Sequence, residues 1–292
     1  TLRAGGSTNM EAGLSLGYQQ IAQHQHDEGV EGRSSRLMIF TDAQPNTGRT
    51  DTGSFIGQVK RAANQGIGFT AFGVGLDFSA SLIDVIANLR GGNYFFLADS
   101  EAIQTIFDKD FEYLVTPLAY DLKLELRIPS GFRFVAAHGV KAWKTGCTTS
   151  TIEVPTIFLS RNKGAMLVEL ERDGGPLPPT AEIPVLSGIL SYTMPDGKAI
   201  TGRMAIGLPE TAFTSQGAVY SQPAVRRVVA LVSEVEGMKE ACRRYWTQQD
   251  PAGARALLLQ IEKLLLDHQT ALMDSSLTNE IALVEKLRDN MK

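Results

Sequence analysis

Two polar residues in the first 42 positions lie where expected elements begin and end. Thr8 belongs to the run GGSTN at residues 5–9, just before a helical segment, and Asp42 follows an apolar run. A hydroxyl and a carboxylate are hard oxygen ligands of the kind that Mg²⁺ prefers. Each residue also has a purely structural interpretation. Thr8 and Glu11 fit a T-x-x-E capping box, and an Asp after a strand commonly bonds within its own loop.

Motifs for catalysis are absent from the sequence. There is no G-x-S-x-G elbow, no phosphate-binding loop and no Cys/His pair, so we expect that the protein is not an enzyme. Zinc binding is excluded because two cysteines and four histidines show no ligand spacing. His138 and His268 are isolated, and acidic residues along the helices are expected to face solvent. Cys147 and Cys242 could form a disulfide or remain free thiols.

The composition is typical of a soluble globular protein. The 292 residues suffice for two or three domains, and 43% of them are hydrophobic and 21% charged. The net charge of −4 gives no indication of a nucleic-acid or anionic-membrane partner. No apolar run approaches the roughly 18–20 residues that span a bilayer. Trp143 and Trp246 are expected to be packing residues.

The first third of the chain is expected to alternate helices and strands. Apolar residues recur at helical spacing in Asn9–Gln25 and in Phe55–Ala63. Strands linked by helices imply parallel pairing with right-handed crossovers, so we expect a doubly wound, Rossmann-like α/β sheet. The runs typical of strands buried on both faces are Arg36–Thr41, Ile67–Val74 and Asn93–Leu97.

The composition changes after Pro117. Six strand-like runs separated by Pro- and Gly-containing turns predict an antiparallel β-sandwich. From about Gln222 the chain is expected to form a helical bundle or hairpin, with Asp250 capping its second helix. One face of its first helix is expected to carry Val225, Val228, Val232, Val235, Met238 and Cys242.

The first region resembles a known family. The runs GGSTN (5–9), FTDAQPN (40–46) and FGVG (72–75) closely resemble the later motifs of von Willebrand factor type A domains. The resemblance is nearest to bacterial members in which a β-rich region and C-terminal helices follow. It implies that residues 1–116 are the C-terminal part of such a domain, 117–221 a β-sandwich-like domain and 222–292 an α-helical region.

In that family a divalent cation lies at the carboxyl ends of the parallel strands, where ligands collect in open α/β sheets. The resemblance implies that Thr8 and Asp42 are two of its ligands, with Ser7, Asn46 and Asp77 as auxiliary residues nearby. The cation would be Mg²⁺, or Mn²⁺ or Ca²⁺, with one position open for a carboxylate of a protein partner.

The family's first-strand motif, D-x-S-x-S, does not occur upstream of Thr8. One literal match, at residues 77–81, lies between runs that fit the family's fifth and sixth strands, so we interpret it as a coincidence. In the family's strand order, 3-2-1-4-5-6, Arg36–Thr41 would then be an open apolar edge. We therefore expect the missing N-terminal half as a separate polypeptide or fragment.

Three functions follow as hypotheses. The leading one is an adhesion-type module, in the family often at the cell envelope, that captures an acidic side chain of a protein partner through the cation. The second is a scaffold without a functional metal that binds partners through its helical tail. The third is a regulatory subunit of an ATPase or chelatase machine.

Overall fold

The computed structural model describes residues 9–24, 27, 34–41, 52–74, 85–86, 88–97, 103–104, 106–140, 142–160, 164–174, 184–208 and 218–291. The chain divides into two compact units. The first comprises residues 1–127, 140–164 and 187–204, and the second comprises residues 128–139, 165–186 and 205–292. Within the described ranges, no helix has the length and apolar character needed to cross a membrane.

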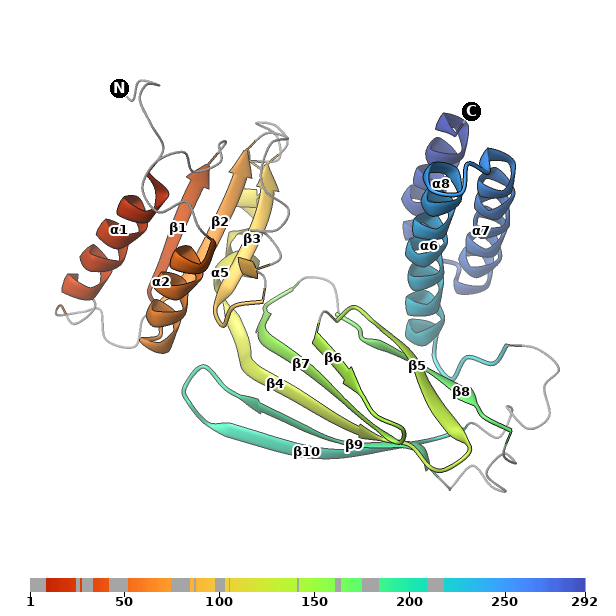
Figure 1. Cartoon of the computed structure of the whole chain (residues 1–292), viewed down its shortest axis with the longest axis horizontal. Coiled ribbons are helices and arrows are strands. Elements are labelled where there is room, and N and C mark those ends of the chain that lie inside the picture. Colours follow the sequence, from red (N-terminus) through yellow and green to blue (C-terminus); the bar gives the residue numbers. More distant parts are fainter. Residues whose placement is uncertain are drawn as a thin grey trace. The chain divides into compact units, whose positions relative to one another are not determined.

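An α/β layer opens the first unit. Its three strands lie side by side in the order β1-β2-β3 and run parallel (Figure 1). The predicted parallel α/β sheet is thereby confirmed. In chain order the elements are α1 (Met10–His24), β1 (Arg36–Thr41), α2 (Thr52–Asn64), β2 (Gly68–Val74), β3 (Gly92–Leu97), a π-helical turn (Ile106–Asp110) and α5 (Phe111–Val115).

Apolar side chains of this sheet are buried on both faces. On one face, Phe69 and Ala71 of β2 pack in a cluster with side chains of α1 and α2, among them Leu14 and Val59. Phe72 alternates to the other face and packs there with residues of the π-helical turn and α5. Burial on both faces explains why these strands are continuous apolar runs in the sequence.

The first unit also contains a five-stranded antiparallel sheet in the order β10-β9-β4-β7-β6. Along β4, Leu122, Leu124 and Leu126 are buried, while the residues between them are exposed or partly exposed. This alternation is the period of two that predicted the strand. The strands are β4 (Pro117–Arg127), β6 (Ala142–Thr145), β7 (Thr149–Phe158), β9 (Pro184–Thr193) and β10 (Ala199–Gly207).

A two-stranded antiparallel sheet and three helices make up the second unit. The strands β5 (Phe132–His138) and β8 (Leu167–Arg172) pair with each other. The helices are α6 (Pro223–Trp246), α7 (Pro251–Leu272) and α8 (Thr278–Asn290), with a short 3₁₀ turn (Ser275–Leu277) before α8. The predicted C-terminal helices are confirmed. Asp250 caps α7 as predicted, because its Oδ1 accepts a hydrogen bond of 2.8 Å from the amide N–H of Gly253.

The inward face of α6 differs from the predicted valine face. Its buried residues are Ala230, Glu234 and Ala241, whereas Val225 and Val235 of the predicted face are exposed. Met238 and Cys242 of that face pack against the bundle core as predicted. Small residues allow α7 to approach closely: a Cβ built at Gly237 would lie 2.0 Å from Cδ1 of Ile261. The Ile261 side chain thus packs against α6 at Gly237, on a face that the spacing of the β-branched residues does not indicate.

Candidate functional site

The start of α1 and the end of β1 meet at one edge of the parallel sheet. Met10, Gly13 and Leu14 of α1 line a groove together with residues Leu37–Thr41 of β1, and its volume is 330 Å³. The helix begins beside the point at which the strand ends (Figure 1). The groove therefore follows the edge of β1 as far as its carboxyl end.

Asn9 holds the N-cap position of α1. Its Oδ1 accepts a hydrogen bond of 3.0 Å from the amide N–H of Ala12, the third residue of the helix. This geometry is that of an N-cap side chain. The predicted capping box of Thr8 and Glu11 rests on a residue outside the described ones, and the cap that the structure shows is Asn9.

The residues predicted for the metal site, Thr8 and Asp42 with Ser7, Asn46 and Asp77, all lie outside the described residues. The structure does describe residues next to two of them in the sequence. Met10 stands two residues after Thr8, and Thr41 directly precedes Asp42, and both neighbours line the same groove. Among the described residues, no group of three or more His, Cys, Asp or Glu side chains could hold a metal ion.

One side of β1 has no strand beside it in the described part of the chain. Its six residues pair with β2 from Arg36↔Gly68 to Thr41↔Gly73. Phe40 of this strand is 56% exposed, although its ring stacks on Phe72 with centroids 4.6 Å apart. The predicted open apolar edge is present among the described strands.

The amino end of the same sheet is fixed to the five-stranded sheet. Arg90, just before β3, forms an ion pair of 3.0 Å with Asp121 of β4, and its guanidinium lies 4.1 Å from the ring centroid of Tyr120. The amide N–H of Gly91 donates to Oγ1 of Thr156 at 2.7 Å. These contacts hold the end of the sheet opposite the candidate metal site, so the carboxyl ends of the strands are left for ligands.

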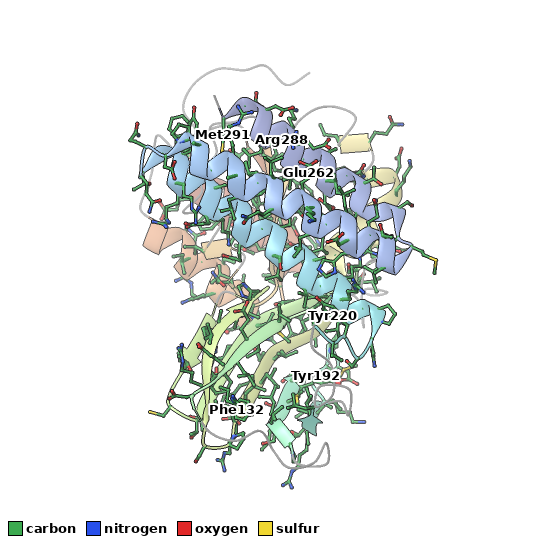
Figure 2. The ribbon with its side chains drawn as sticks, turned by 90° about the vertical axis from the view of Figure 1, so that its right-hand side faces the viewer. Phe132, Tyr192, Tyr220, Glu262, Arg288 and Met291 are labelled. Atoms are coloured by element: carbon green, nitrogen blue, oxygen red, sulfur yellow. The ribbon has the colours of Figure 1, made fainter. Side chains whose placement is uncertain are left out.

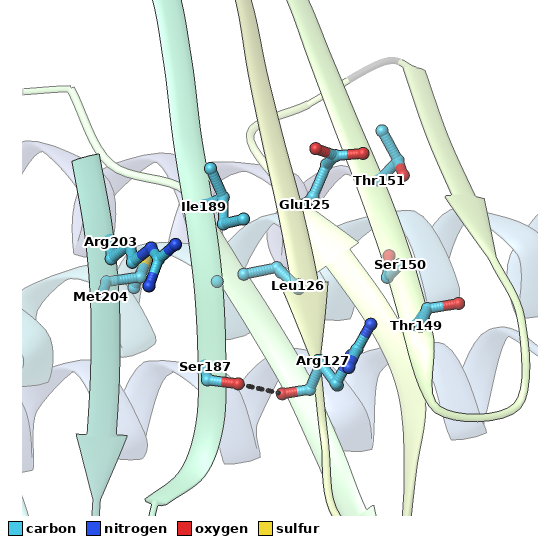
Figure 3. Close-up of a pocket in the computed structure, with 11 residues that line it drawn as sticks. Glu125, Leu126, Arg127, Thr149, Ser150, Thr151, Ser187, Ile189, Arg203 and Met204 are labelled. Carbon is cyan, nitrogen blue, oxygen red and sulfur yellow. Dashed lines mark hydrogen bonds between the residues drawn. The ribbon is translucent and has the colours of Figure 1, made fainter. Parts of the chain in front are cut away.

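The exposed face of the five-stranded sheet has a polar hollow. It is lined by residues of β4, β7, β9 and β10, among them Arg127, Arg203 and Thr151 (Figure 3). In the described residues, no acidic side chain pairs with Arg127 or Arg203. Glu125, which also lines the hollow, pairs with Lys123 at 2.8 Å.

Buried polar groups were missed by the sequence interpretation of the second unit. His268 is 4% exposed, and its Nδ1 accepts a hydrogen bond of 3.1 Å from Nε of Arg226. Burial, with the neighbouring charge of Arg226 as a second cause, lowers the pKa of His268. The prediction of an isolated histidine is therefore wrong. No signal within the sequence could have shown this contact, because the partners are 42 residues apart.

Other expectations for the second unit also change. Glu262 of α7 and Arg288 of α8 form an ion pair within the helical bundle (Figure 2). His138 contacts Glu169 at 2.8 Å and Glu236 at 3.5 Å. Trp246 is 71% exposed, so it is not a core residue. Cys147 and Cys242 are free thiols, which answers the question about a disulfide.

The N-terminal region matches a known domain family. Residues 1–109 match the von Willebrand factor type A domain, so the family suggested by the three motifs is confirmed for this region. Domains of this type generally serve as protein-interaction modules. YfbK, an uncharacterized protein of Escherichia coli (strain K12), is 29% identical over 127 residues, which are 43% of this chain and 21% of YfbK.

A solved structure extends the similarity in fold beyond this domain. The von Willebrand factor type A protein from Catenulispora acidiphila matches with a TM-score of 0.52 at 16% sequence identity. The match covers 92% of this chain and 62% of that chain. The similarity in fold thus extends over the antiparallel strands and the C-terminal helices, and the present chain spans less than two thirds of the length of that structure.

Proposed function

We propose that the chain is a protein-interaction module that holds a divalent cation at the carboxyl edge of the β1-β2-β3 sheet and captures an acidic side chain of its partner. Thr8 and Asp42 would supply a hydroxyl and a carboxylate, with Ser7, Asn46 and Asp77 nearby. The observation that carries the proposal is the convergence of Met10 and Thr41, the described neighbours of the two ligands, on one groove.

The cap of α1 supports this role for Thr8. Because Asn9 already accepts the N–H of Ala12, the Thr8 hydroxyl is not required for capping. A helix N-terminus also favours an anion, which suits the carboxylate of an incoming partner. Two protein oxygens leave Mg²⁺ mostly hydrated, so the cation would bind weakly to this chain alone and more tightly when further oxygen ligands are supplied.

The open edge of β1 offers a place for a further strand. A strand in the groove would satisfy the backbone groups on the free side of β1 and cover its apolar residues. We therefore propose that the remaining ligands of the cation come from a segment paired with this edge.

Calorimetric titration with Mg²⁺ and Mn²⁺ tests the metal site. The parent protein should bind Mn²⁺, and bound Mn²⁺ should broaden the amide signals of Asn9, Met10 and Thr41 in NMR spectra. Asp42→Ala should abolish both effects. Asp196→Ala is the matched control, because Asp196 lies in the turn between β9 and β10 and its carboxylate accepts from the amide N–H of Lys198 at 2.9 Å. Equal binding by the parent and Asp42→Ala would refute the proposal.

A scaffold function through the helical region is the second candidate. Ala254, Leu258, Ile261 and Leu265 of α7 are buried in the bundle core. Leu259 and Leu266 are instead 52% and 44% exposed and lie seven residues apart on one face. This candidate predicts that partner binding survives Asp42→Ala and is lost in Leu259→Glu. A regulatory subunit of an ATPase would instead co-purify with that enzyme.

A further inference from the structure

We infer that a cavity at the amino end of the parallel sheet binds a small organic anion, in which a carboxylate or phosphate group is attached to an apolar body. This inference is independent of the proposed function. The cavity has a volume of 590 Å³, within the usual range for small-molecule sites. It is lined by Ser34, Ser35, Arg36, Met38, Gly66, Gly68, Phe111, Val115, Thr116, Pro117, Tyr120 and Pro195.

Arg36 supplies the positive charge of the cavity. It is partly buried, and no carboxylate in the described residues pairs with it. Its hydrogen bonds all leave from Nη1, to the carbonyl oxygens of Phe69 and Gly91 at 3.0 Å and to Oγ1 of Thr70 at 2.9 Å. A guanidinium has five N–H donors, so the N–H groups of Nε and Nη2 have no described acceptor.

The position of this guanidinium is fixed by the protein. A Cβ built at Gly68 would lie 2.6 Å from Nη2 of Arg36, so a glycine is needed for the side chain to lie across the start of β2. Phe158 of β7 holds it from another side, with 5.1 Å between the guanidinium carbon and the ring centroid. Burial lowers the pKa of Arg36 and thus disfavours its charged form. A bound anion would offset that cost.

Neutral hydrogen-bonding groups stand beside this charge. The side-chain hydroxyls of Ser34, Ser35 and Thr116 line the cavity, and none of them bonds to a described residue. A guanidinium whose Nε and Nη2 N–H groups form one available edge binds a carboxylate or phosphate through paired, charge-assisted hydrogen bonds. The polar end of the cavity therefore suits an oxyanion.

The apolar residues that line the cavity indicate the character of the part of the ligand that carries the anionic group. Met38, Phe111, Val115 and Pro117 offer an apolar surface next to the polar end. A bare inorganic anion would leave this surface in contact with water, whereas an apolar body would cover it. β1 separates the cavity at Arg36 from Thr41 by roughly 17 Å, at about 3.3 Å per residue, so this site is distinct from the candidate metal site.

Benzoate, phenyl phosphate and the neutral benzamide are suitable probes, titrated at constant ionic strength while ¹H–¹⁵N NMR spectra are recorded. Both anions should shift the Nε–H signal of Arg36 and the backbone signals of Ser35, Gly68 and Thr116 in a saturable way. Benzamide should leave them unchanged. The anion with the lower dissociation constant identifies whether carboxylate or phosphate is preferred.

Three variants complete the test on the full chain. Arg36→Lys retains the charge without the paired donors and should weaken benzoate binding at least about tenfold. Ser35→Leu should weaken it by filling the cavity while the hydrogen bonds of Arg36 remain. Arg127→Met, which removes an exposed arginine of the other hollow, should change the affinity less than about twofold.

Any of four results would overturn the inference, and the first three concern specificity and location. They are equal binding of benzamide and benzoate, unchanged affinity in both Arg36→Lys and Ser35→Leu, and signal changes centred on Arg127 and Arg203. Absence of any saturable shift with either anion would overturn it as well.

Discussion

Glu234 is a carboxylic acid in the core of the helical bundle. Its side chain is 3% exposed on the face of α6 that carries Ala230 and Ala241. Burial raises the pKa of Glu234 to about 7, and the charge of Glu280 on α8 contributes in the same direction. Desolvation and a like charge both disfavour the ionised form. The acid is therefore neutral in the folded bundle at slightly acidic pH.

The pH dependence of stability follows from this shift. The folded-state pKa lies above the ordinary 4.5, so the unfolded chain releases its proton first as the pH rises. The contribution of the protonated Glu234 to the free energy of unfolding is fully present below pH 4.5, and it is lost as the pH rises toward about 7. Glu234→Gln cannot ionise, so it should gain in free energy of unfolding relative to the parent as the pH rises. This difference between variant and parent should be about 2–3 kcal/mol larger at pH 8 than at pH 4.

Urea unfolding at pH 4 and pH 8, followed by far-ultraviolet circular dichroism, measures this difference. Glu285→Gln on α8 is the control for the loss of a negative charge and should leave the pH dependence of the parent in place. Glu280→Gln should reduce the pH dependence in part, because it removes only the smaller cause. Identical pH dependence in the parent and Glu234→Gln would contradict the assignment.

At the scale of elements, the contact between α6 and α7 depends on Gly237. Replacing a helical glycine with alanine normally stabilises a helix by up to about 1 kcal/mol. At Gly237 the added Cβ would meet Cδ1 of the buried Ile261 at 2.0 Å and its Cγ1 at 2.8 Å. We expect Gly237→Ala to destabilise the protein by about 1–3 kcal/mol, because overpacking outweighs the gain in helix propensity.

Thermal unfolding of single and double variants tests this expectation. Gly13→Ala in α1 is the matched control, since a Cβ there has no atom within 4 Å, and it should be neutral or stabilising. Ile261→Val combined with Gly237→Ala should recover part of the loss, which a double-mutant cycle would detect. Full additivity of the two substitutions would argue against a direct clash.

Elements with a strong periodic signal could be predicted from the sequence. The apolar run of β1 predicted that strand, because burial on both faces of a sheet favours a continuous apolar sequence. The alternation along β4 predicted that strand, because burial on one face favours every second residue to be apolar. The four-residue strand β6, with the sequence AWKT, was missed because it is too short to carry a period. The face of α6 was predicted only in part: Met238 and Cys242 pack against the bundle core as expected, whereas Val225 and Val235 are exposed. The close approach at Gly237 is a property of two helices together, so one helix's sequence could not show it.

The candidate sites divide in the same way. Thr8 and Asp42 belong to local motifs, so they could be proposed from neighbouring residues alone. The role of Arg36 could not be predicted in this way. The groups that contact its guanidinium belong to β2, to the residue before β3 and to β7, which lie 33 to 122 positions further along the chain. A charge becomes recognisable as unpaired only when all its neighbours are known.

At the scale of the whole molecule, the five-stranded sheet joins distant parts of the sequence. β4 lies between β7 and β9, which end at Phe158 and Thr193. A fragment of residues 1–127 would retain the matched von Willebrand factor type A region and leave both edges of β4 unpaired. We expect this fragment to aggregate, whereas residues 1–208 should keep the complete sheet.

Expression of both fragments, followed by size-exclusion chromatography and circular dichroism, tests this expectation. Replacing Leu118 and Leu122 of β4 with Lys in the shorter fragment controls for aggregation through that strand and should restore solubility. A monomeric, cooperatively folded fragment of residues 1–127 would show that the α/β layer does not depend on the antiparallel sheet.

The two compact units alternate along the sequence. Their six segments follow one another in turn, so the chain passes between the units five times. During synthesis, β4 leaves the ribosome long before β9, its second neighbour, has been translated. The first unit can close only after residue 204 has emerged, when the helices of the second unit are still to be made. The growing chain therefore exposes one edge of β4 until β9, which ends at Thr193, has been translated, and chaperones that cover this edge would protect the chain from aggregation during that interval.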